Sequence, residues 1–282
     1  MGIKIVTDST SYIPKNLLDK YDIKVVSLNI SIKDKNIREL DITNEEFYRL
    51  LDETKEFPKS SQPSLQEMID VFENILKEGN DIIGIFISSE YSGTYSSANL
   101  IKKELLEKYP DRKIELIDSR SNCMQMGICA LNGAKLAKEN ASIEEVVESV
   151  KYCVNNSRFL FTPATLDYLK MGGRIGSAGA LFGKLLKIRP ILTVNYGKTD
   201  VVEKVRTKNK AVEKILDIFL NEVNEKGLGD VFVHHINCEE EGLKIAEIIR
   251  EKVGVIPQVV SIGPVIGVHV GPGAVGIAYS TK

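Results

Sequence analysis

Residues 82–98 read IIGIFISSEYSGTYSSA, and the expected fold is organised around this segment. It begins with an Ile-rich apolar run, which is typical of a strand buried on both faces. A polar break at residues 88–94 follows, and helical spacing then returns and continues to Tyr109. The segment therefore predicts a strand–loop–helix unit of an open α/β sheet, in which ligands bind at the carboxyl ends of the strands.

The loop at residues 88–94 places hydroxyl groups at the amino end of the predicted helix. Free backbone N–H groups at a helix N-terminus favour an anion, and the hydroxyls of Ser92 and Thr94 would add donors. We therefore expect an anion pocket that has no fixed positive charge of its own. The loop alone leaves a second interpretation open, in which Ser92 or Thr94 only caps the helix.

The composition limits the classes of protein to consider. The chain has 282 residues, enough for two domains or one large one, and 43% of them are apolar, which can build a normal core. Its net charge of -2 argues against a general nucleic-acid binder. No apolar run approaches the ~20 residues that cross a bilayer. Residues 3–6 already read as a strand with no signal-peptide core before them, so we expect a cytoplasmic location.

Cysteine and histidine residues give no metal site. The cysteines form no C-x-x-C pair, and in a cytoplasmic chain they are expected to be free thiols. They are Cys123, Cys129, Cys153 and Cys238. His234, His235 and Cys238 superficially resemble a metal cluster, but they end an apolar run and no further ligand set is apparent. We expect these three residues to have a structural role.

The first half of the chain alternates between strand and helix patterns. Strands are predicted at residues 3–6, 25–32, 82–87 and 113–117, and helices at 14–20, 45–53, 64–79, 95–109, 124–139 and 142–155. Thr43, Ser64 and Ser142 each begin a capping-box pattern. Asp8 follows the first strand, so it could share a sheet edge with Ser92 or cap the next helix. The alternation predicts a parallel, helix-covered sheet with right-handed crossovers.

The second half predicts a mixed sheet with further helices. Strands are expected at residues 159–163, 231–235 and 259–262, a hairpin at 191–194 and 201–206, and helices at 166–170, 178–188, 209–225 and 240–253. Residues 265–270 alternate like a strand, which would project His269 from a glycine-flanked face. That histidine is either a core residue or a ligand-binding one, and the pattern leaves both open.

Two further polar segments have no complete structural explanation. The loop at residues 59–64 carries three hydroxyls, and capping accounts only for Ser64, which leaves Ser60 and Ser61. Arg174 lies in the glycine-rich turn at 172–176. It is either a solvated surface charge or a group positioned to bind an anion or a partner's phosphate.

Taken together, these segments resemble the DegV family over essentially the whole chain. The similar stretches are residues 7–10, 60–64, 88–95, 172–176 followed by 189–192, and 263–276, which occur in the family's order. The resemblance implies two α/β domains, at residues 1–157 and 158–282, with a lipid tunnel at their interface. The family's studied members are the fatty-acid-binding subunits of bacterial fatty acid kinase.

The resemblance therefore implies a non-catalytic carrier of a long-chain fatty acid such as palmitate. Its partner would be the ATP-binding subunit of the kinase, which phosphorylates the carboxylate to an acyl phosphate used in phospholipid synthesis. It implies no cofactor and no nucleic acid, and it allows transient contact with a membrane surface. A buried carboxylate must recover hydrogen bonds, and each buried methylene of a tail contributes ~0.8 kcal/mol.

Carried onto this chain, the resemblance also names the residues of the site. It places the carboxylate near Ser60, Ser61, Ser92, Thr94 and His269. It places Arg174 toward the head-group and the kinase-facing surface, and the helix at residues 178–188 would line or cover the tail. The family usually has Thr where this chain has Ser60; a hydroxyl remains, so we expect binding to survive.

Two other functions fit parts of the sequence. A serine hydrolase would use Ser92 and His269, with Asp8 or Asp118 as the orienting acid, but the sequence around Ser92 is not G-x-S-x-G. A nucleotide-dependent kinase would need a phosphate-binding loop, and no G-x-x-x-x-G-K-[ST] is present. Residues 271–276 have the G-x-G-x-x-G spacing, but they lie at the end of the chain with no helix to follow.

Overall fold

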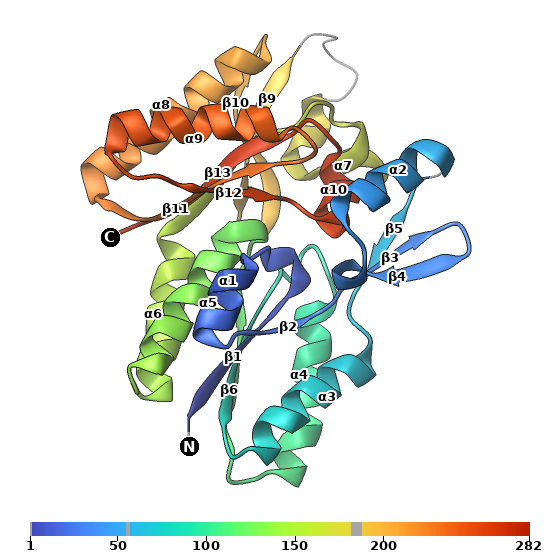
Figure 1. Ribbon diagram of the computed structural model, residues 1–282, viewed down its shortest axis with the longest axis vertical. Coiled ribbons are helices and arrows are strands. Elements are labelled where there is room, and N and C mark those ends of the chain that lie inside the picture. Colours follow the sequence, from blue (N-terminus) through green and yellow to red (C-terminus); the bar gives the residue numbers. More distant parts are fainter. Residues whose placement is uncertain (1, 55–56, 182–187) are drawn as a thin grey trace.

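The first half of the chain builds a parallel four-stranded sheet (Figure 1). The structure is a computed structural model that describes residues 2–54, 57–181 and 188–282. The strand order in this sheet is β2-β1-β6-β7. The strands are β1 (Ile3–Asp8), β2 (Lys24–Val26), β6 (Asp81–Phe86) and β7 (Ile114–Asp118). All three pairings are parallel, so the carboxyl ends of the strands share one edge, as the sequence predicts.

Alternate residues of β6 face two different layers of helices. Ile83 and Ile85 join the core beneath α5, whereas Ile82 and Phe86 pack with α3 and α4. The helices of this half are α1 (Lys15–Tyr21), α3 (Leu65–Lys77), α4 (Thr94–Lys108), α5 (Cys123–Lys138) and α6 (Ile143–Asn155). The run is apolar throughout because the strand is covered on both faces.

The second half builds a mixed six-stranded sheet in the order β10-β9-β8-β13-β11-β12. Its strands are β8 (Ser157–Thr162), β9 (Arg189–Asn195), β10 (Lys198–Val205), β11 (Leu228–His235), β12 (Gln258–Ser261) and β13 (Val275–Thr281). Only β11 and β12 pair in parallel among them. Helices α8 (Lys208–Lys226) and α9 (Glu239–Val253) cover one face of this sheet.

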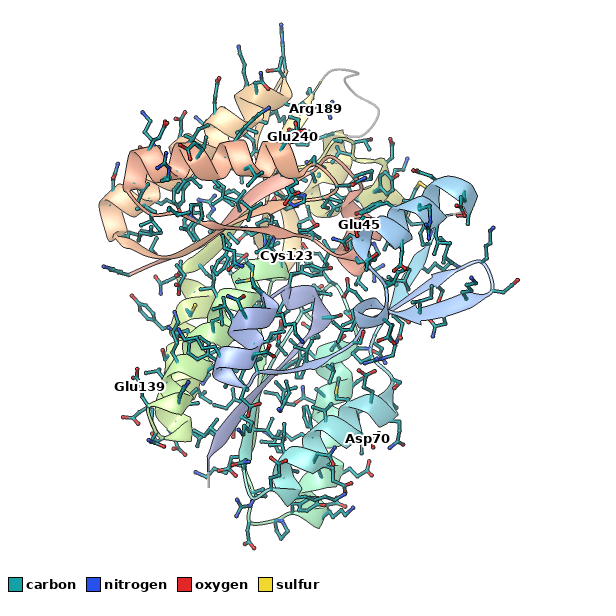
Figure 2. The ribbon with its side chains drawn as sticks, viewed as in Figure 1. Glu45, Asp70, Cys123, Glu139, Arg189 and Glu240 are labelled. Atoms are coloured by element: carbon teal, nitrogen blue, oxygen red, sulfur yellow. The ribbon has the colours of Figure 1, made fainter. Side chains whose placement is uncertain are left out.

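Helix α5 lies between the two sheets. It contacts β1 of the parallel sheet and β8 and β13 of the mixed sheet, and it is buried on nearly every side. In Figure 2, Cys123 at its start lies in the middle of the molecule, whereas Asp70 and Glu139 lie toward the outside. The expected boundary between residues 157 and 158 falls inside β8, which begins at Ser157, and it stays a prediction.

A small antiparallel sheet, in the order β4-β3-β5, lies beside both halves. Its strands are β3 (Asn29–Ile32), β4 (Lys35–Arg38) and β5 (Lys59–Ser61). Helix α2 (Asn44–Thr54) lies between β4 and β5 in the sequence. Helix α10 (Pro264–Val270) packs against β3, β5 and α7 (Asp167–Met171). These contacts bring the end of the chain against its first sixty residues.

Residues 265–270 form a helix, so the predicted alternating strand is wrong. Gly263 is the N-cap of α10 and Pro264 occupies its first turn, where proline is favoured. Six of its seven residues are buried, so a helix and a strand give the same apolar pattern here. The glycine-rich residues that follow the helix lead into strand β13, so no phosphate-binding loop forms there.

The predicted strand at residues 25–32 is divided between two sheets. β2 ends at Val26 and β3 begins at Asn29. Between these two strands the backbone hydrogen bonds do not continue either sheet. The Leu28 N–H donates to Ser9 Oγ (3.1 Å), and the Leu28 carbonyl accepts from the Glu39 N–H (2.8 Å).

Local signals in the sequence are confirmed at several helix ends. Thr43 and Glu46 form a full capping box, as do Ser142 and Glu145, and Ser64 caps α3. The helix predicted at residues 178–188 is replaced in its described part by a 3-10 helix, Gly176–Leu181, and residues 182–187 lie outside the description. Across the described residues, none of the helices is both long and apolar enough to cross a membrane.

Candidate functional site

A pocket lies between the two halves of the chain and is lined by residues from both. It encloses about 920 Å³ of space free of protein atoms, its open mouth included. Much of its wall is apolar. The polar side chains in the wall are those of Ser60, Ser61, Gln62, Tyr91, Ser92, Asn122, Arg174, Thr199 and His269. Thr94 does not line the pocket and lies fully buried behind Ser92.

Ser60 and His269 meet although 209 residues separate them. Ser60 Oγ lies 2.7 Å from His269 Nε2, because β5 carries the serine and the helix packed against it, α10, carries the histidine. The pairing of Ser60 with Ile30 in the small sheet fixes the position of β5. The structure thus brings together two residues that the sequence analysis placed in one site.

His269 is neutral at physiological pH. Its pKa is lowered to about 4, first because burial disfavours the charged ring and second because the positive charge of Arg174 is close. Its Nδ1 is buried and has no hydrogen-bond partner. An unpaired lone pair is tolerated more readily than an unpaired N–H, so we assign the proton to Nε2, which then donates to Ser60. This leaves the Ser60 hydroxyl proton free for a ligand.

Gly172 is packed against the His269 ring. A Cβ at this glycine would collide with His269 Nδ1, while its φ of -75° is open to any residue. Glycine is therefore required here for close approach and not for backbone conformation. The predicted Gly-Gly-Arg turn thus positions the imidazole as well as the arginine.

Arg174 brings to the pocket a fixed positive charge that the Ser92 loop itself lacks, and the family resemblance placed this arginine toward the head-group. Its guanidinium donates to the Tyr91 carbonyl (2.8 Å from Nη2) and to the Gly172 carbonyl (2.6 Å from Nη1). The Thr199 hydroxyl donates to the Arg174 carbonyl at 2.7 Å and also bonds Tyr91 Oη at 2.9 Å. In the described part of the chain no carboxylate forms an ion pair with Arg174, so its charge is not neutralised by the protein.

The Ser92 loop contacts the first turn of α4 and also lines the pocket. Ser92 Oγ accepts from the Thr94 N–H at 3.3 Å, which serves the first turn of α4, and it lies 2.9 Å from Thr94 Oγ1. Ser92 and Gly93 also line the pocket, so the amino end of α4 faces it. The helix therefore directs its positive dipole end at the pocket.

Asp8 supports this loop from behind. Its carboxylate accepts from the Ile87 N–H (2.8 Å) and from the Thr10 N–H (3.0 Å), so it joins the ends of β1 and β6 and caps the 3-10 helix Ser9–Ser11. Burial raises its pKa to about 6, against the opposing effect of these hydrogen bonds. It does not line the pocket, and it does not cap the helix after Pro14 as one interpretation suggested.

Glu39 holds the start of helix α10, which carries His269. This buried carboxylate accepts from the Val265 N–H and from Tyr12 Oη, both at 2.8 Å, and from Ser9 Oγ. Burial raises its pKa to about 7, despite these hydrogen bonds. An acid from the first half thus caps a helix from the second half, which fixes one wall of the pocket.

A hydrolase triad is not assembled among the described residues. His269 bonds Ser60 and not Ser92, and its Nδ1 faces no orienting carboxylate. Asp118 accepts instead from Ser89 Oγ at 2.6 Å. The low pKa of His269 also makes it a weak general base.

His234 and His235 have structural hydrogen bonds, in agreement with the expected structural role. His234 Nε2 accepts from the Met124 N–H at the start of α5 (3.0 Å), while Nδ1 lies 3.0 Å from the Val260 carbonyl. His235 Nδ1 accepts from the Cys238 N–H. No group of three or more potential ligands that could hold a metal ion occurs among the described residues. All four cysteines are free.

Sequence reasoning missed several polar residues of the pocket. Tyr91 and Asn122 follow strands β6 and β7, so the rule that ligands bind at the carboxyl ends of strands would have found them. Thr199 lies in the hairpin strand β10 and Gln62 follows β5, and neither has a comparable signal.

The fold and the site define an α/β protein with one partly polar pocket between a parallel and a mixed sheet. A family profile described as "Uncharacterised protein, DegV family" matches residues 2–282. A DegV domain-containing protein of Clostridium acetobutylicum is 50% identical over 282 residues, which are 100% of this chain and 99% of that relative. The chain therefore belongs to the DegV family.

Two solved structures share the fold over their whole length. A protein from Eubacterium ventriosum, described as a fat acid (stearic acid)-binding protein, is 30% identical with a TM-score of 0.91, and the match covers 99% of this chain and 98% of that one. DegV from Bacillus subtilis, described as a fatty acid binding protein, is 32% identical with a TM-score of 0.88, and both chains are covered completely.

Proposed function

We propose that this chain binds a long-chain fatty acid such as palmitate in the pocket between its halves. The observation that carries the proposal is the composition of the pocket wall. Hydroxyls, a neutral imidazole and a guanidinium without an acidic partner face a pocket that is otherwise largely apolar. That combination suits a ligand with an acidic head and an apolar tail, and the descriptions of the solved relatives support the same ligand class.

In this proposal the carboxylate is held by Ser60, Ser61, Ser92, Thr94 and His269, with Arg174 at the head-group. His269 acts through Ser60: the imidazole N–H donates to the serine oxygen, and the serine hydroxyl donates to the carboxylate. Thr94 acts through Ser92 in the same manner. Arg174 has N–H groups that its bonds to Tyr91 and Gly172 leave unused, and hydrogen bonds to a charged group are the stronger ones.

The tail provides most of the affinity. Each methylene that leaves water contributes ~0.8 kcal/mol, so an acyl chain offers more than the head-group bonds can. The head-group bonds repay the desolvation of the carboxylate and set the direction of the ligand. Apolar residues of β8 and α10, such as Phe161 and Ile266, would contact the tail.

Mass spectrometry of an organic extract of the purified protein tests the ligand class. We expect a stoichiometric fatty acid, and its binding should weaken about 10-fold in His269→Ala, because Ser60 loses the N–H that orients its hydroxyl, and the loss of a buried partner costs ~1–3 kcal/mol. Ser89→Ala is the matched control, since Ser89 belongs to the same loop as Ser92 but bonds Asp118 outside the pocket. An empty extract together with no measurable fatty-acid affinity would overturn the proposal.

The second part of the proposal is that a separate ATP-binding kinase subunit phosphorylates the bound carboxylate. The product would be an acyl phosphate for phospholipid synthesis, and Arg174 would lie at the head-group or face the kinase. The absence of a G-x-x-x-x-G-K-[ST] motif from the sequence supports leaving ATP to the partner. Acyl phosphate, trapped with hydroxylamine, should form only when carrier, kinase subunit and ATP are all present. Its formation by this chain and ATP alone would contradict the carrier role.

The proposal also includes the domain organisation and the cellular location of the protein. It assigns residues 1–157 and 158–282 to two domains whose interface holds the ligand. It places the carrier in the cytoplasm, with transient contact with a membrane surface and no role for nucleic acid. Separation of cell extracts into cytosol and membrane fractions, with and without added fatty acid, checks the location.

A further inference from the structure

Asn122 is a polar residue of the pocket that the proposed head-group site does not use. It follows β7, precedes α5 and lines the pocket, and the residue is only 9% exposed. Its Oδ1 is buried without a hydrogen-bond partner. The described residues thus supply no hydrogen bond to this buried amide oxygen. Buried polar groups are rarely left in that state.

The local structure keeps this amide free. Asn122 occupies the N-cap position of α5, but its side chain makes no capping bond. An N-cap side chain can accept a hydrogen bond from the N–H two residues later, but the Met124 N–H donates to His234 Nε2 instead. The neighbouring Ser121 and Gln125 bond each other at 2.5 Å, and Gln125 also donates to the Ser157 carbonyl. Every polar side chain around Asn122 at this turn has a partner, and Asn122 does not.

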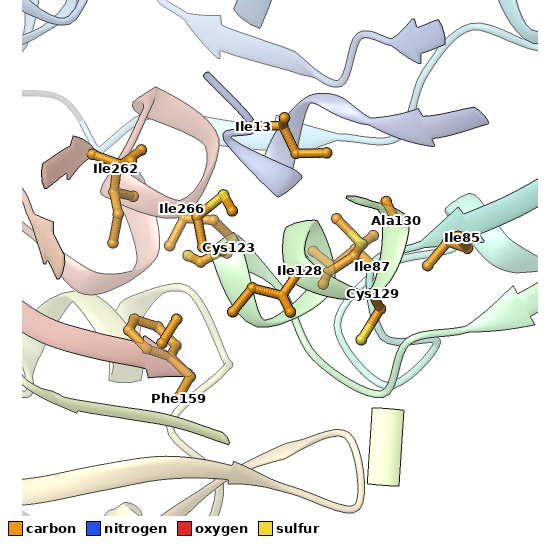
Figure 3. Packing of buried hydrophobic residues seen from close by; sticks show 14 of the residues in the cluster. Ile13, Ile85, Ile87, Cys123, Ile128, Cys129, Ala130, Phe159, Ile262 and Ile266 are labelled. Atoms are coloured by element: carbon orange, nitrogen blue, oxygen red, sulfur yellow. The ribbon is translucent and has the colours of Figure 1, made fainter. Parts of the chain in front are cut away.

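The surroundings of Asn122 within the pocket are apolar. Cys123, the next residue, belongs to the same buried cluster as Phe159 and Ile266, and Figure 3 draws these side chains around the start of α5. Phe159 and Ile266 also line the pocket. No hydrogen bond joins Asn122 to Ser60, Ser92, Arg174 or His269 within the described chain. A buried amide oxygen without a partner therefore lies in the wall of a pocket that also contains these apolar side chains.

We propose that Asn122 selects fatty acids that carry a hydroxyl group on the acyl chain; this inference rests on the proposed function. A hydroxyl both donates and accepts, so it satisfies the amide in either orientation. An unsubstituted tail would leave the amide unpaired against methylene groups. Sites built to hydrogen-bond a ligand hydroxyl discriminate strongly against the analogue that lacks it.

Competition binding with palmitate and a series of monohydroxypalmitates, which differ only in the position of the hydroxyl, tests this selection. We expect one isomer to bind the unaltered protein about 10-fold more tightly than palmitate does, the effect of one satisfied buried polar group. Asn122→Leu keeps the branched shape of the side chain and removes the amide. In this variant the preferred isomer should lose affinity while palmitate gains, so the two ligands change in opposite directions.

Ile266→Val is the control in the pocket wall, since it removes one methylene and leaves the amide. It should weaken palmitate and the hydroxylated isomer by the same factor, with their ratio unchanged. If the unaltered protein binds all the acids equally, or if Asn122→Leu weakens all of them alike, the selection by Asn122 is refuted and fatty-acid binding stands. If no acid binds at all, the proposed function itself fails.

Discussion

The pocket has two polar walls, and they differ in how many of their polar groups form hydrogen bonds within the protein. On the Ser92 wall the hydroxyls of Ser92 and Thr94 bond each other and the first turn of α4. On the His269 wall the Nδ1 of the imidazole has no partner, and Arg174 has no acidic partner among the described residues. The first wall is complete without a ligand, whereas the second keeps the unused N–H groups and the charge of Arg174 in reserve. Substitutions on the second wall should therefore have the larger effects.

Glu39 gives the largest expected effect, because it anchors the helix of the His269 wall. Its folded-state pKa of about 7 lies above the ordinary value of 4.5, so its contribution to stability is full below pH 4.5 and is lost as pH rises through 7. The loss is about 3 kcal/mol, since one pKa unit corresponds to ~1.4 kcal/mol. Between pH 5 and 8, the difference in unfolding free energy between Glu39→Gln and the unaltered protein should shift by that amount in favour of the variant.

Taking the difference between the two proteins cancels the contributions of His234, His269 and Asp8, which titrate in the same range. Denaturant unfolding at a series of pH values measures this difference in unfolding free energy. Parallel pH profiles for the two proteins would show that Glu39 is not the titrating anchor of α10.

Gly172→Ala should displace the His269 ring while leaving the backbone unstrained. The added Cβ collides with Nδ1 and displaces the ring from Ser60, and the loss of one buried partner costs ~2 kcal/mol, equivalent to a ~30-fold loss of fatty-acid affinity. Gly179→Ala is the matched control in the following segment, because a Cβ there meets only Ile175 at an ordinary 3.6 Å. Titration with a fluorescent fatty acid compares the two. Equal affinity in both variants would remove His269 from the site.

Arg174→Gln should weaken fatty-acid binding about 10-fold, since it removes one charge-assisted hydrogen bond to the carboxylate. The same titration with the matched fatty alcohol, which has no charge, supplies the internal control. The alcohol should bind both proteins equally. A loss of the same size for acid and alcohol would indicate that Arg174 supports the structure through Tyr91 and Gly172 and does not hold an anion.

Ser92→Ala should have the smallest effect, about 3–5-fold, because the amino end of α4 remains and the Ser92 hydroxyl is already hydrogen-bonded to Thr94, so its net contribution is ~1 kcal/mol. Isothermal titration resolves a change of this size. A loss larger than that of Arg174→Gln would reverse the ranking of the two walls.

The sequence predicts the Ser92 wall better than the His269 wall for a physical reason. A buried parallel strand, a polar loop and an amphipathic helix have distinct patterns, so β6 and α4 could be located, and capping boxes marked helix ends. Helix α10 is buried almost all round, so its periodicity carried no information, and the pattern predicted a strand there. That Ser60 and His269 belong to one site came from the family resemblance, because residue spacing cannot show a contact between segments so far apart.

Helix α5 has a consequence for how the molecule unfolds. Because it is enclosed by both sheets, neither sheet can lose its partner without exposing the same helix to water. Heating should accordingly melt the chain in a single calorimetric transition, and a fragment truncated after residue 157 should aggregate instead of folding alone.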